Sequence, residues 1–289
     1  LVDFWNKNSD LSFSVNEESV PMGTAGSVKL LDNILTDTFV VASGDSVLYS
    51  DLEVLVSAHK SSKAKVTMAL WEVDDPTQFG IVGLSKMQNG DVDGSLKQGY
   101  ISRFLEKPTV EQSFSNVINA GLYIIEPDVM SYVPKDTKFD FSKQLFPHLL
   151  ELGLPMYGVK LDGVWFDVGT PEELIKAQNH LVKNHELLPF GLPKGESIDD
   201  SGYLIDNSIS YSKLCRTVLS SNSIVGNDCE LIDSIIMEGS TVGNNCSLIR
   251  TVVGENVIVG DNCELIDCVI GDEVHVTVGT KLTYERVSK

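Results

Sequence analysis

The sequence predicts an α/β domain with a largely parallel sheet, followed by a domain of stacked β-coils. Segments typical of strands alternate with segments typical of helices through the first two thirds of the chain. The last third repeats with a fixed short period and contains all five cysteines. We therefore expect the first domain at 1–182, a linker containing Pro and Gly at 183–200, and the second domain at 201–289.

The composition is that of a globular protein with an acidic surface. The 289 residues are 42% hydrophobic and 22% charged, and the formal net charge is −19. Such a surface repels a nucleic-acid backbone, so we expect no nucleic-acid partner. The sequence contains no run of 18 apolar residues, so we expect no membrane span. It shows no signal peptide, and we expect a cytoplasmic protein.

Residue patterns and flanking residues predict the elements of the first domain. Thr170 caps the last helix, Pro171 occupies its first position, and Gly153 follows the end of the helix before it. The predicted strands are 38–47, 65–73, 99–108 and 119–127, the predicted helices are 50–62 and 139–153, and 163–182 holds a strand, a turn and a helix.

Two acidic residues end predicted strands. Asp45 ends the buried parallel strand expected in "TFVVASGDSV", and Asp167 lies in "VWFDVGT". Because ligands bind beyond the carboxyl ends of the strands in such a sheet, these two carboxylates could share a divalent cation. Strand-end Asp residues also cap turns and helices, and the pattern alone leaves both interpretations open.

The stretch "VPMGTAGSVKLL" (20–31) raises the question of a phosphate site. Its Pro and Gly residues open a helix that we expect to begin near Ser27. The stretch lacks the Lys and Ser/Thr pair of a P-loop, so phosphate binding of that type is not expected. Residues without bulk allow close approach of a ligand to the backbone, whereas a plain turn into a helix is the alternative.

The last third repeats every 17 residues, as the spacing of Cys229, Cys246 and Cys263 shows. The same shift aligns a leucine column and a valine column, which are Leu231, Leu248 and Leu265, and Val225, Val242, Val259 and Val276. This predicts about four coils over 212–279, each of three strands of about six, six and five residues. The pattern resembles the hexapeptide-repeat, left-handed parallel β-helix.

The repeated cysteines are predicted to fill space rather than to react. Stacked coils lie about 4.8 Å apart, which is further than the Cβ atoms of a disulfide prefer. The sequence has no Cys-X-X-Cys pair, so we do not expect zinc. His275 could be the base of an acyltransferase, but we expect it at the surface.

Six segments occur in the order shown by sugar-1-phosphate nucleotidyltransferases. They are "EESVPMGTAG", "VVASGD", "DDPTQFGIV", "RFLEKP", "NAGLYIIEP" and "WFDVGTPEE". From about residue 10 to its end, the chain resembles this family, and in particular the mannose-1-phosphate guanylyltransferases and their glucose-1-phosphate relatives that carry a C-terminal β-helix. The resemblance implies an N-terminally incomplete, Rossmann-like nucleotidyltransferase domain followed by a left-handed parallel β-helix.

The resemblance also implies two sets of binding residues. The set against the base and ribose of the nucleotide is Gly23, Thr24, Ala25 and Gly26. The set against the sugar is Gly80, Glu106, Lys107 and Asn119, with Lys107 near the sugar phosphate.

The implied reaction is in-line attack of a sugar 1-phosphate oxygen on the α-phosphorus of a nucleoside triphosphate, and pyrophosphate leaves. Asp45 and Asp167 would hold Mg²⁺ at the phosphates, and Lys107 would supply a fixed positive charge. The implied partners are a nucleoside triphosphate and a sugar 1-phosphate. GDP-mannose is the favoured product, and glucose with dTTP or UTP is the alternative.

The beginning of the chain departs from the family. The family opens with a Gly-rich segment containing Gly-Thr-Arg and then Lys-Pro, and we do not find this segment here. The sequence begins with Leu1 rather than Met. We expect a truncated chain, a segment supplied by another chain, or a non-catalytic regulatory or sugar-nucleotide-binding subunit.

Truncation has consequences that can be stated in advance. The strand at 40–43 would be central in the sheet but would keep an open edge. These 289 residues alone would bind nucleoside triphosphate poorly, release no pyrophosphate and tend to aggregate. Because apolar coil edges invite pairing, we also expect a homo-oligomer formed through the β-helix.

Overall fold

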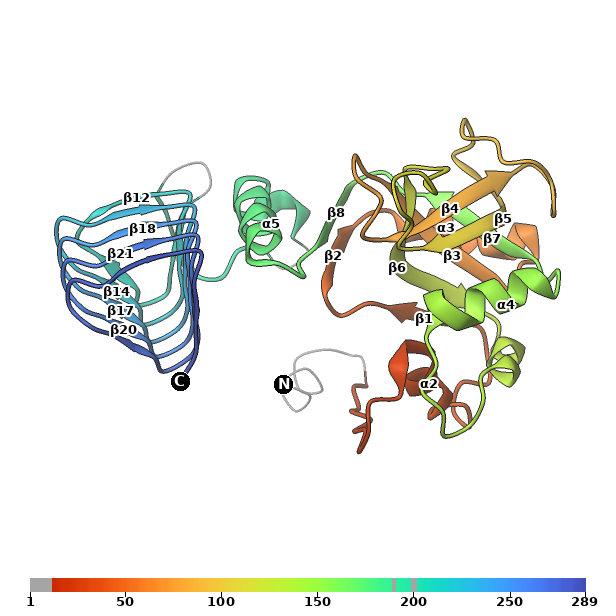
Figure 1. Cartoon of the computed structure of the whole chain (residues 1–289), viewed down its shortest axis with the longest axis horizontal. Coiled ribbons are helices and arrows are strands. Elements are labelled where there is room, and N and C mark those ends of the chain that lie inside the picture. The colour runs from red at the N-terminus through yellow and green to blue at the C-terminus, as the bar shows by residue number, and fades with distance from the viewer. Residues whose placement is uncertain (1–11, 189–190, 199–201) are drawn as a thin grey trace. The chain divides into compact units, whose positions relative to one another are not determined.

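The computed structural model describes residues 12–188, 191–198 and 202–289, which form two compact units (Figure 1). Unit 1 is made from Leu1–Gly44 and Ser50–Gly163, and unit 2 from Asp45–Tyr49 and Val164–Lys289. Within the predicted linker at 183–200, residues 189, 190, 199 and 200 lie outside the described residues. The helix expected at the end of the first domain belongs to unit 2.

Unit 1 is built on a six-stranded sheet with the order β1-β6-β3-β7-β5-β4, and β4 also pairs with β6. Its strands are β1 (Phe39–Ala42), β3 (Val66–Glu72), β4 (Gly80–Ser85), β5 (Gln98–Glu106), β6 (Val117–Ile125) and β7 (Met156–Lys160). Among the described strands of this sheet, β3 and β7 form the one parallel pair. The expectation of a largely parallel sheet is wrong, because β4, β5 and β6 follow one another without helices and antiparallel strands need no crossover.

The segment predicted as one buried parallel strand is two short strands. β1 ends at Ala42, the chain turns at Gly44, and β2 (Ser46–Tyr49) belongs to unit 2. β1 runs antiparallel to β6 and, within the described part of the chain, pairs with no other strand. Val40 is 60% exposed, so β1 is an edge strand and not a central one; the expected open edge is confirmed.

The helices of unit 1 follow their local signals closely. They are α2 (Gly23–Lys29), α3 (Leu52–Ser62), the 3₁₀ helix η1 (Pro127–Tyr132), the π-helix η2 (Phe141–Leu145) and α4 (Phe146–Glu151). Asp51 caps α3 by accepting from Glu53 N, and Gly153 follows α4 with a φ of 67°. α2 begins at Gly23 rather than near Ser27, because Gly23 makes the turn into the helix with a φ of 74°.

Unit 2 begins with a two-stranded ribbon, in which β2 runs antiparallel to β8 (Val164–Asp167). Helix α5 (Pro171–Lys183) follows, and the short 3₁₀ helix η3 (His185–Leu187) comes after it. Thr170 caps α5 by accepting a hydrogen bond from Glu173 N at 3.2 Å, and Pro171 lies in the first turn, so the predicted helix start is confirmed.

The rest of unit 2 is a parallel β-solenoid of three sheets, seen as stacked coils in Figure 1. The first sheet contains β9 (Gly195–Ser197), β10 (Tyr203–Ile205), β13 (Val218–Leu219), β16 (Ile235–Ile236), β19 (Val252–Val253), β22 (Val269–Ile270) and β25 (Arg286–Val287). The second contains β11 (Ile209–Ser210), β14 (Ile224–Val225), β17 (Thr241–Val242), β20 (Ile258–Val259) and β23 (His275–Val276). The third contains β12 (Lys213–Cys215), β15 (Glu230–Ile232), β18 (Ser247–Ile249), β21 (Glu264–Ile266) and β24 (Lys281–Thr283).

The strands of these sheets pair residues that are 17 positions apart, so the predicted repeat is confirmed. Leu231 pairs with Leu248 and Leu248 with Leu265, and the valine column pairs in the same way. The strands contain two or three residues and are shorter than expected, because left-handed residues such as Asp233 and Asn245 turn the corners. β24 and β25 pair with β21 and β22, so the coils extend beyond the predicted range of 212–279.

The solenoid interior is mostly apolar, and four of the five cysteines belong to its buried core. Cys229, Cys246 and Cys263 are buried, and no disulfide joins them. Burial raises the pKa of the Cys246 thiol to about 11, so it stays protonated at neutral pH. The prediction of inert filling residues is confirmed, and His275 is exposed as expected.

Replacing buried Ile236 by Ala should destabilise the protein by about 2–5 kcal/mol, because its side chain is 0% exposed and leaves a cavity. Ile258→Ala is the matched control, since Ile258 is 47% exposed on the outside of the same solenoid, and should cost less than about 1 kcal/mol. Urea unfolding followed by circular dichroism measures both. Equal costs would mean that these two residues are not on opposite sides of the coil wall.

Candidate functional site

The first turn of α2, residues 23–26, is hydrogen-bonded to the segment around Phe139, which is far away in the sequence. Ala25 N and Gly26 N both donate hydrogen bonds to Phe139 O, each at 2.9 Å. A Cβ atom on Gly23 would lie 2.8 Å from Phe139 O, and one on Gly26 would lie 2.9 Å from Thr137 O. Both glycines are therefore required for this contact between two backbone segments.

Thr24 is the one exposed residue of this turn. Its N–H donates to Asp140 Oδ1 at 3.2 Å, and its Oγ1 accepts from Phe141 N at 3.0 Å. Thr24 is exposed, whereas Ala25 and Gly26 are buried. The predicted nucleotide set is thus a turn with one outward side chain, which Asp140 and Phe141 hold in place.

The π-helix η2 connects this turn to Asn119. Asp140 immediately precedes η2, and Ser142 within it accepts a hydrogen bond from Asn119 Nδ2 at 3.2 Å. Asn119 Nδ2 also donates to Tyr123 Oη at 2.7 Å, and Asn119 Oδ1 accepts from Gly121 N at 3.0 Å. Single π-turns are rare and occur frequently at functional sites. Both amide hydrogens of Asn119 are used internally, so a sugar hydroxyl would meet its Oδ1.

Gly80 and Glu106 face each other across β4 and β5. A Cβ atom on Gly80 would lie 2.7 Å from Glu106 Oε2, so a side chain here would displace the carboxylate. Lys107 N donates to Phe79 O at 2.9 Å, and Lys107 adopts a φ of 46°. The β4–β5 edge therefore presents Glu106 and Lys107 together.

The electrostatics connect these groups to η2. Burial raises the pKa of Glu106, while the positive charges of Lys107 and Lys143 oppose that shift and Asp140 adds to it. Burial also raises the pKa of Tyr123 to about 12, with Glu106 contributing, so the phenol is neutral at physiological pH. Thr24, Glu106, Lys107 and Asn119 thus belong to one polar cluster in unit 1.

Several residues of this cluster were not predicted. They are Tyr123, Asp140, Ser142 and Lys143. The segment "FDFSKQ" gave the one available indication, because four of its six residues are polar and interrupt the apolar pattern where a helix was expected to begin. Tyr123 carried no such signal, since a tyrosine in an apolar strand is ordinary.

The two predicted metal ligands lie together in unit 2. Asp167 is paired with Ser46 across the β2–β8 ribbon, and Val168 N donates to Asp45 O at 3.1 Å. Both acids are therefore at the same end of the ribbon. Asp167 Oδ1 also accepts from Gly169 N at 3.2 Å, so the turn-capping interpretation applies to this oxygen.

Two carboxylates suit Mg²⁺, which prefers oxygen ligands and usually keeps water or phosphate in the remaining positions. Within the described ranges, no group of three or more His, Cys, Asp and Glu side chains could hold a metal ion. Asp45 and Asp167 fit a cation that takes its other ligands from phosphates and water.

Comparison with known families identifies the class of protein. Residues 3–184 match the nucleotidyl transferase family, and residues 203–288 match the GMPPB C-terminal domain. The first match covers more than half of the sequence. The chain belongs to the nucleotidyl transferase family.

Individual relatives make the similarity concrete. A UTP–glucose-1-phosphate uridylyltransferase of Synechocystis sp. is 35% identical over 153 residues, which are 51% of this chain and 37% of that protein. A mannose-1-phosphate guanyltransferase of Eremothecium gossypii is 31% identical over 216 residues, which are 72% of this chain and 55% of that protein. A mannose-1-phosphate guanyltransferase of Saccharomyces cerevisiae is 33% identical over 170 residues, which are 57% of this chain and 43% of that protein. The chain thus spans about half the length, or less, of these curated relatives.

Among its described helices, none is long and apolar enough to cross a membrane.

Glu106→Gln should raise the melting temperature at neutral pH, because burial disfavours the ionised carboxylate. The native pKa lies above the unfolded value, so the penalty is full above the native pKa, declines as the pH falls below it, and is absent below the unfolded pKa. Thermal unfolding between about pH 4 and 8 measures this effect, with exposed Glu17→Gln as the control. A lower melting temperature for Glu106→Gln at neutral pH would mean that attraction by Lys107 and Lys143 outweighs burial.

Proposed function

We propose that the protein transfers a nucleotidyl group from a nucleoside triphosphate to a sugar 1-phosphate. The observation that supports this most is the polar cluster around η2, which groups Thr24, Lys107 and Asn119 although they come from three separate segments. Family membership supports the reaction class. An oxygen of the sugar phosphate attacks the α-phosphorus, the bond from that phosphorus to the pyrophosphate oxygen breaks, and the charge leaves with pyrophosphate.

In this proposal the side chains bind and orient both substrates. Thr24 contacts the nucleoside, and Asn119 and Glu106 contact sugar hydroxyls. Lys107 and Lys143 offset the negative charge of the sugar phosphate. Asp45 and Asp167 would hold Mg²⁺, which neutralises phosphate charge when bound.

We favour GDP-mannose as the product. Support comes from the match of 203–288 to the GMPPB C-terminal domain and from relatives named as mannose-1-phosphate guanyltransferases. The Synechocystis relative, named for UTP and glucose 1-phosphate, supports the other sugar and base. A non-catalytic sugar-nucleotide-binding subunit remains the alternative. The homo-oligomer through the solenoid and the cytoplasmic location stay predictions.

Pyrophosphate release should be fastest with GTP and mannose 1-phosphate among pairs of GTP, UTP or dTTP with mannose or glucose 1-phosphate. The assay is run on the 289-residue chain and on the same chain supplied with the Gly-rich opening segment of the family, in cis or as a separate chain. Binding of GDP-mannose without release from either form would favour the non-catalytic subunit. Neither binding nor release with any pair would contradict the proposal.

Asp45→Asn or Asp167→Asn should reduce turnover by about 100-fold or more, because a cation at the phosphates is worth several kcal/mol in the transition state. Asp162→Asn is the control, since its side chain is 93% exposed and lies outside the ribbon end. Circular dichroism should show unchanged folding for all three variants. Full Mg²⁺-dependent turnover in either ribbon variant would rule out the metal assignment.

A further inference from the structure

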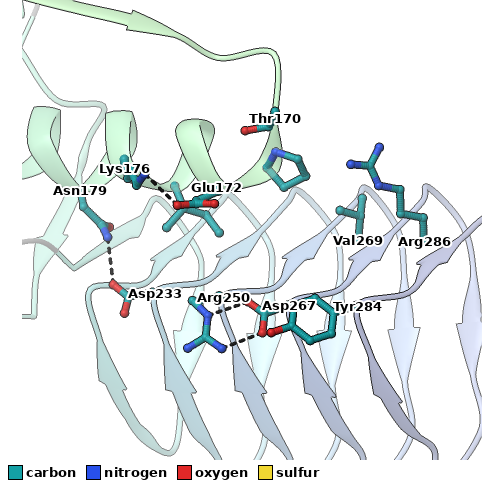
Figure 2. Close-up of a pocket in the computed structure, with 12 residues that line it drawn as sticks. Thr170, Glu172, Lys176, Asn179, Asp233, Arg250, Asp267, Val269, Tyr284 and Arg286 are labelled. Atoms are coloured by element: carbon teal, nitrogen blue, oxygen red, sulfur yellow. Dashed lines mark hydrogen bonds and ion pairs between the residues drawn. The ribbon is translucent and has the colours of Figure 1, made fainter. Parts of the chain in front are cut away.

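Unit 2 contains a pocket of about 670 Å³ between α5 and the outer face of the solenoid (Figure 2). Helix α5 contributes Ile175 and Lys176, and the solenoid contributes Val269, Tyr284 and Arg286. All lining residues belong to unit 2, and none belongs to the polar cluster of unit 1 or is one of the two ribbon acids. Its volume is within the range of small-molecule sites.

The floor of the pocket is an apolar column that α5 covers only in part. The column follows the register of the first sheet and consists of Val218, Ile235, Val252, Val269 and finally Arg286. Ile175 of α5 packs on Ile235 and Val252. Val269 and Arg286 occupy the next two rungs and line the pocket. The column therefore changes from apolar to cationic inside the pocket.

The acidic groups of the pocket already have cationic or polar partners. Lys176 lies 2.8 Å from Glu172, and Arg250 makes two bonds of 2.6 Å to Asp267. The third acid, Asp233, accepts from Asn179 at 3.0 Å and from both Nε and Nη2 of Arg216 at 2.7 Å.

Arg286 differs from these groups. Within the described part of the chain, its guanidinium takes part in no ion pair or hydrogen bond. Figure 2 shows it beside Val269, and the Tyr284 ring lies next to Asp267. Tyr284 is 79% exposed, so its ring offers a flat apolar surface at the edge of the pocket.

We infer that this pocket binds a small organic oxyanion, a phosphate ester or a carboxylate that carries a ring or other apolar portion. The planar guanidinium of Arg286 matches the geometry of phosphate and carboxylate oxygens. The apolar portion covers Val269 and Ile175 and contacts the Tyr284 ring. Asp267 and Asp233 do not compete for Arg286, because they form ion pairs with Arg250 and Arg216.

Phenyl phosphate is the probe, and benzoate tests the carboxylate form of the same chemistry. With the full chain labelled at Ile and Val methyl groups, phenyl phosphate should shift the Val269 and Ile175 signals but not those of Ile258 on another face. We expect a Kd of about 1 mM or tighter for a ligand of this size. Arg286→Gln should weaken binding by about tenfold or more. Lys213→Gln removes one positive charge elsewhere on the solenoid and should change nothing.

Two further comparisons make the test decisive. Arg286→Lys keeps the positive charge without the planar guanidinium, so its affinity for phenyl phosphate should lie between those of the wild type and Arg286→Gln. Such partial binding would show that the weaker binding of Arg286→Gln is not caused by a loss of folding. Inorganic phosphate should bind more weakly than phenyl phosphate, because it leaves the apolar floor uncovered. The inference would be overturned if benzylamine, a cation, or inorganic phosphate bound as tightly as phenyl phosphate. It would also be overturned if Arg286→Gln left the signal shifts caused by phenyl phosphate unchanged.

Discussion

The candidate site of unit 1 depends on one contact, the hydrogen bonds from Ala25 and Gly26 to the carbonyl oxygen of Phe139. This contact joins two segments that are far apart in the sequence, and the neighbouring hydrogen bond from Thr24 to Asp140 spans 116 residues. It lies directly before η2, where Ser142 accepts a hydrogen bond from Asn119 and the charge of Lys143 lowers the pKa of Glu106. The glycines at 23 and 26 are therefore structural requirements first, because any Cβ there would clash with backbone oxygens.

Unit 2 follows a different constraint, the strict register of parallel coils. Its interior tolerates apolar residues of several kinds, including Cys246, because each rung sees the same neighbours above and below. Its corners require left-handed backbone, which Asn and Asp adopt most readily among residues with side chains. The outer surface carries no such restriction. Charged groups there, such as Arg250 and Asp267, can pair along the stack, and α5 can cover one apolar column.

The sequence predicted what is local or periodic and missed what depends on distant pairing. The spacing of Leu231 and Leu248 predicted the register, because in a solenoid each repeat meets only its neighbours. Thr170 predicted the start of α5 because a cap acts within one turn. Strand direction in unit 1 was predicted wrongly, since apolar runs do not encode which strands pair. The acids at 45 and 167 were expected at one place, and the β2–β8 ribbon brings them there by antiparallel pairing. Asp140 and Lys143 were missed because a π-turn leaves little trace in an apolar helix pattern.

The central claim is that residues on both sides of η2 belong to one sugar-nucleotide site. The most direct test is backbone NMR of the ¹⁵N-labelled chain titrated with GDP-mannose, in wild type and in Asp140→Asn. We expect the amide signals of Thr24, Lys107 and Asn119 to move together with one dissociation constant. Asp140→Asn should weaken all three responses equally, because Asp140 binds Thr24 and immediately precedes η2. Shifts at Thr24 with none at Asn119 or Lys107, or three different dissociation constants, would contradict a single site.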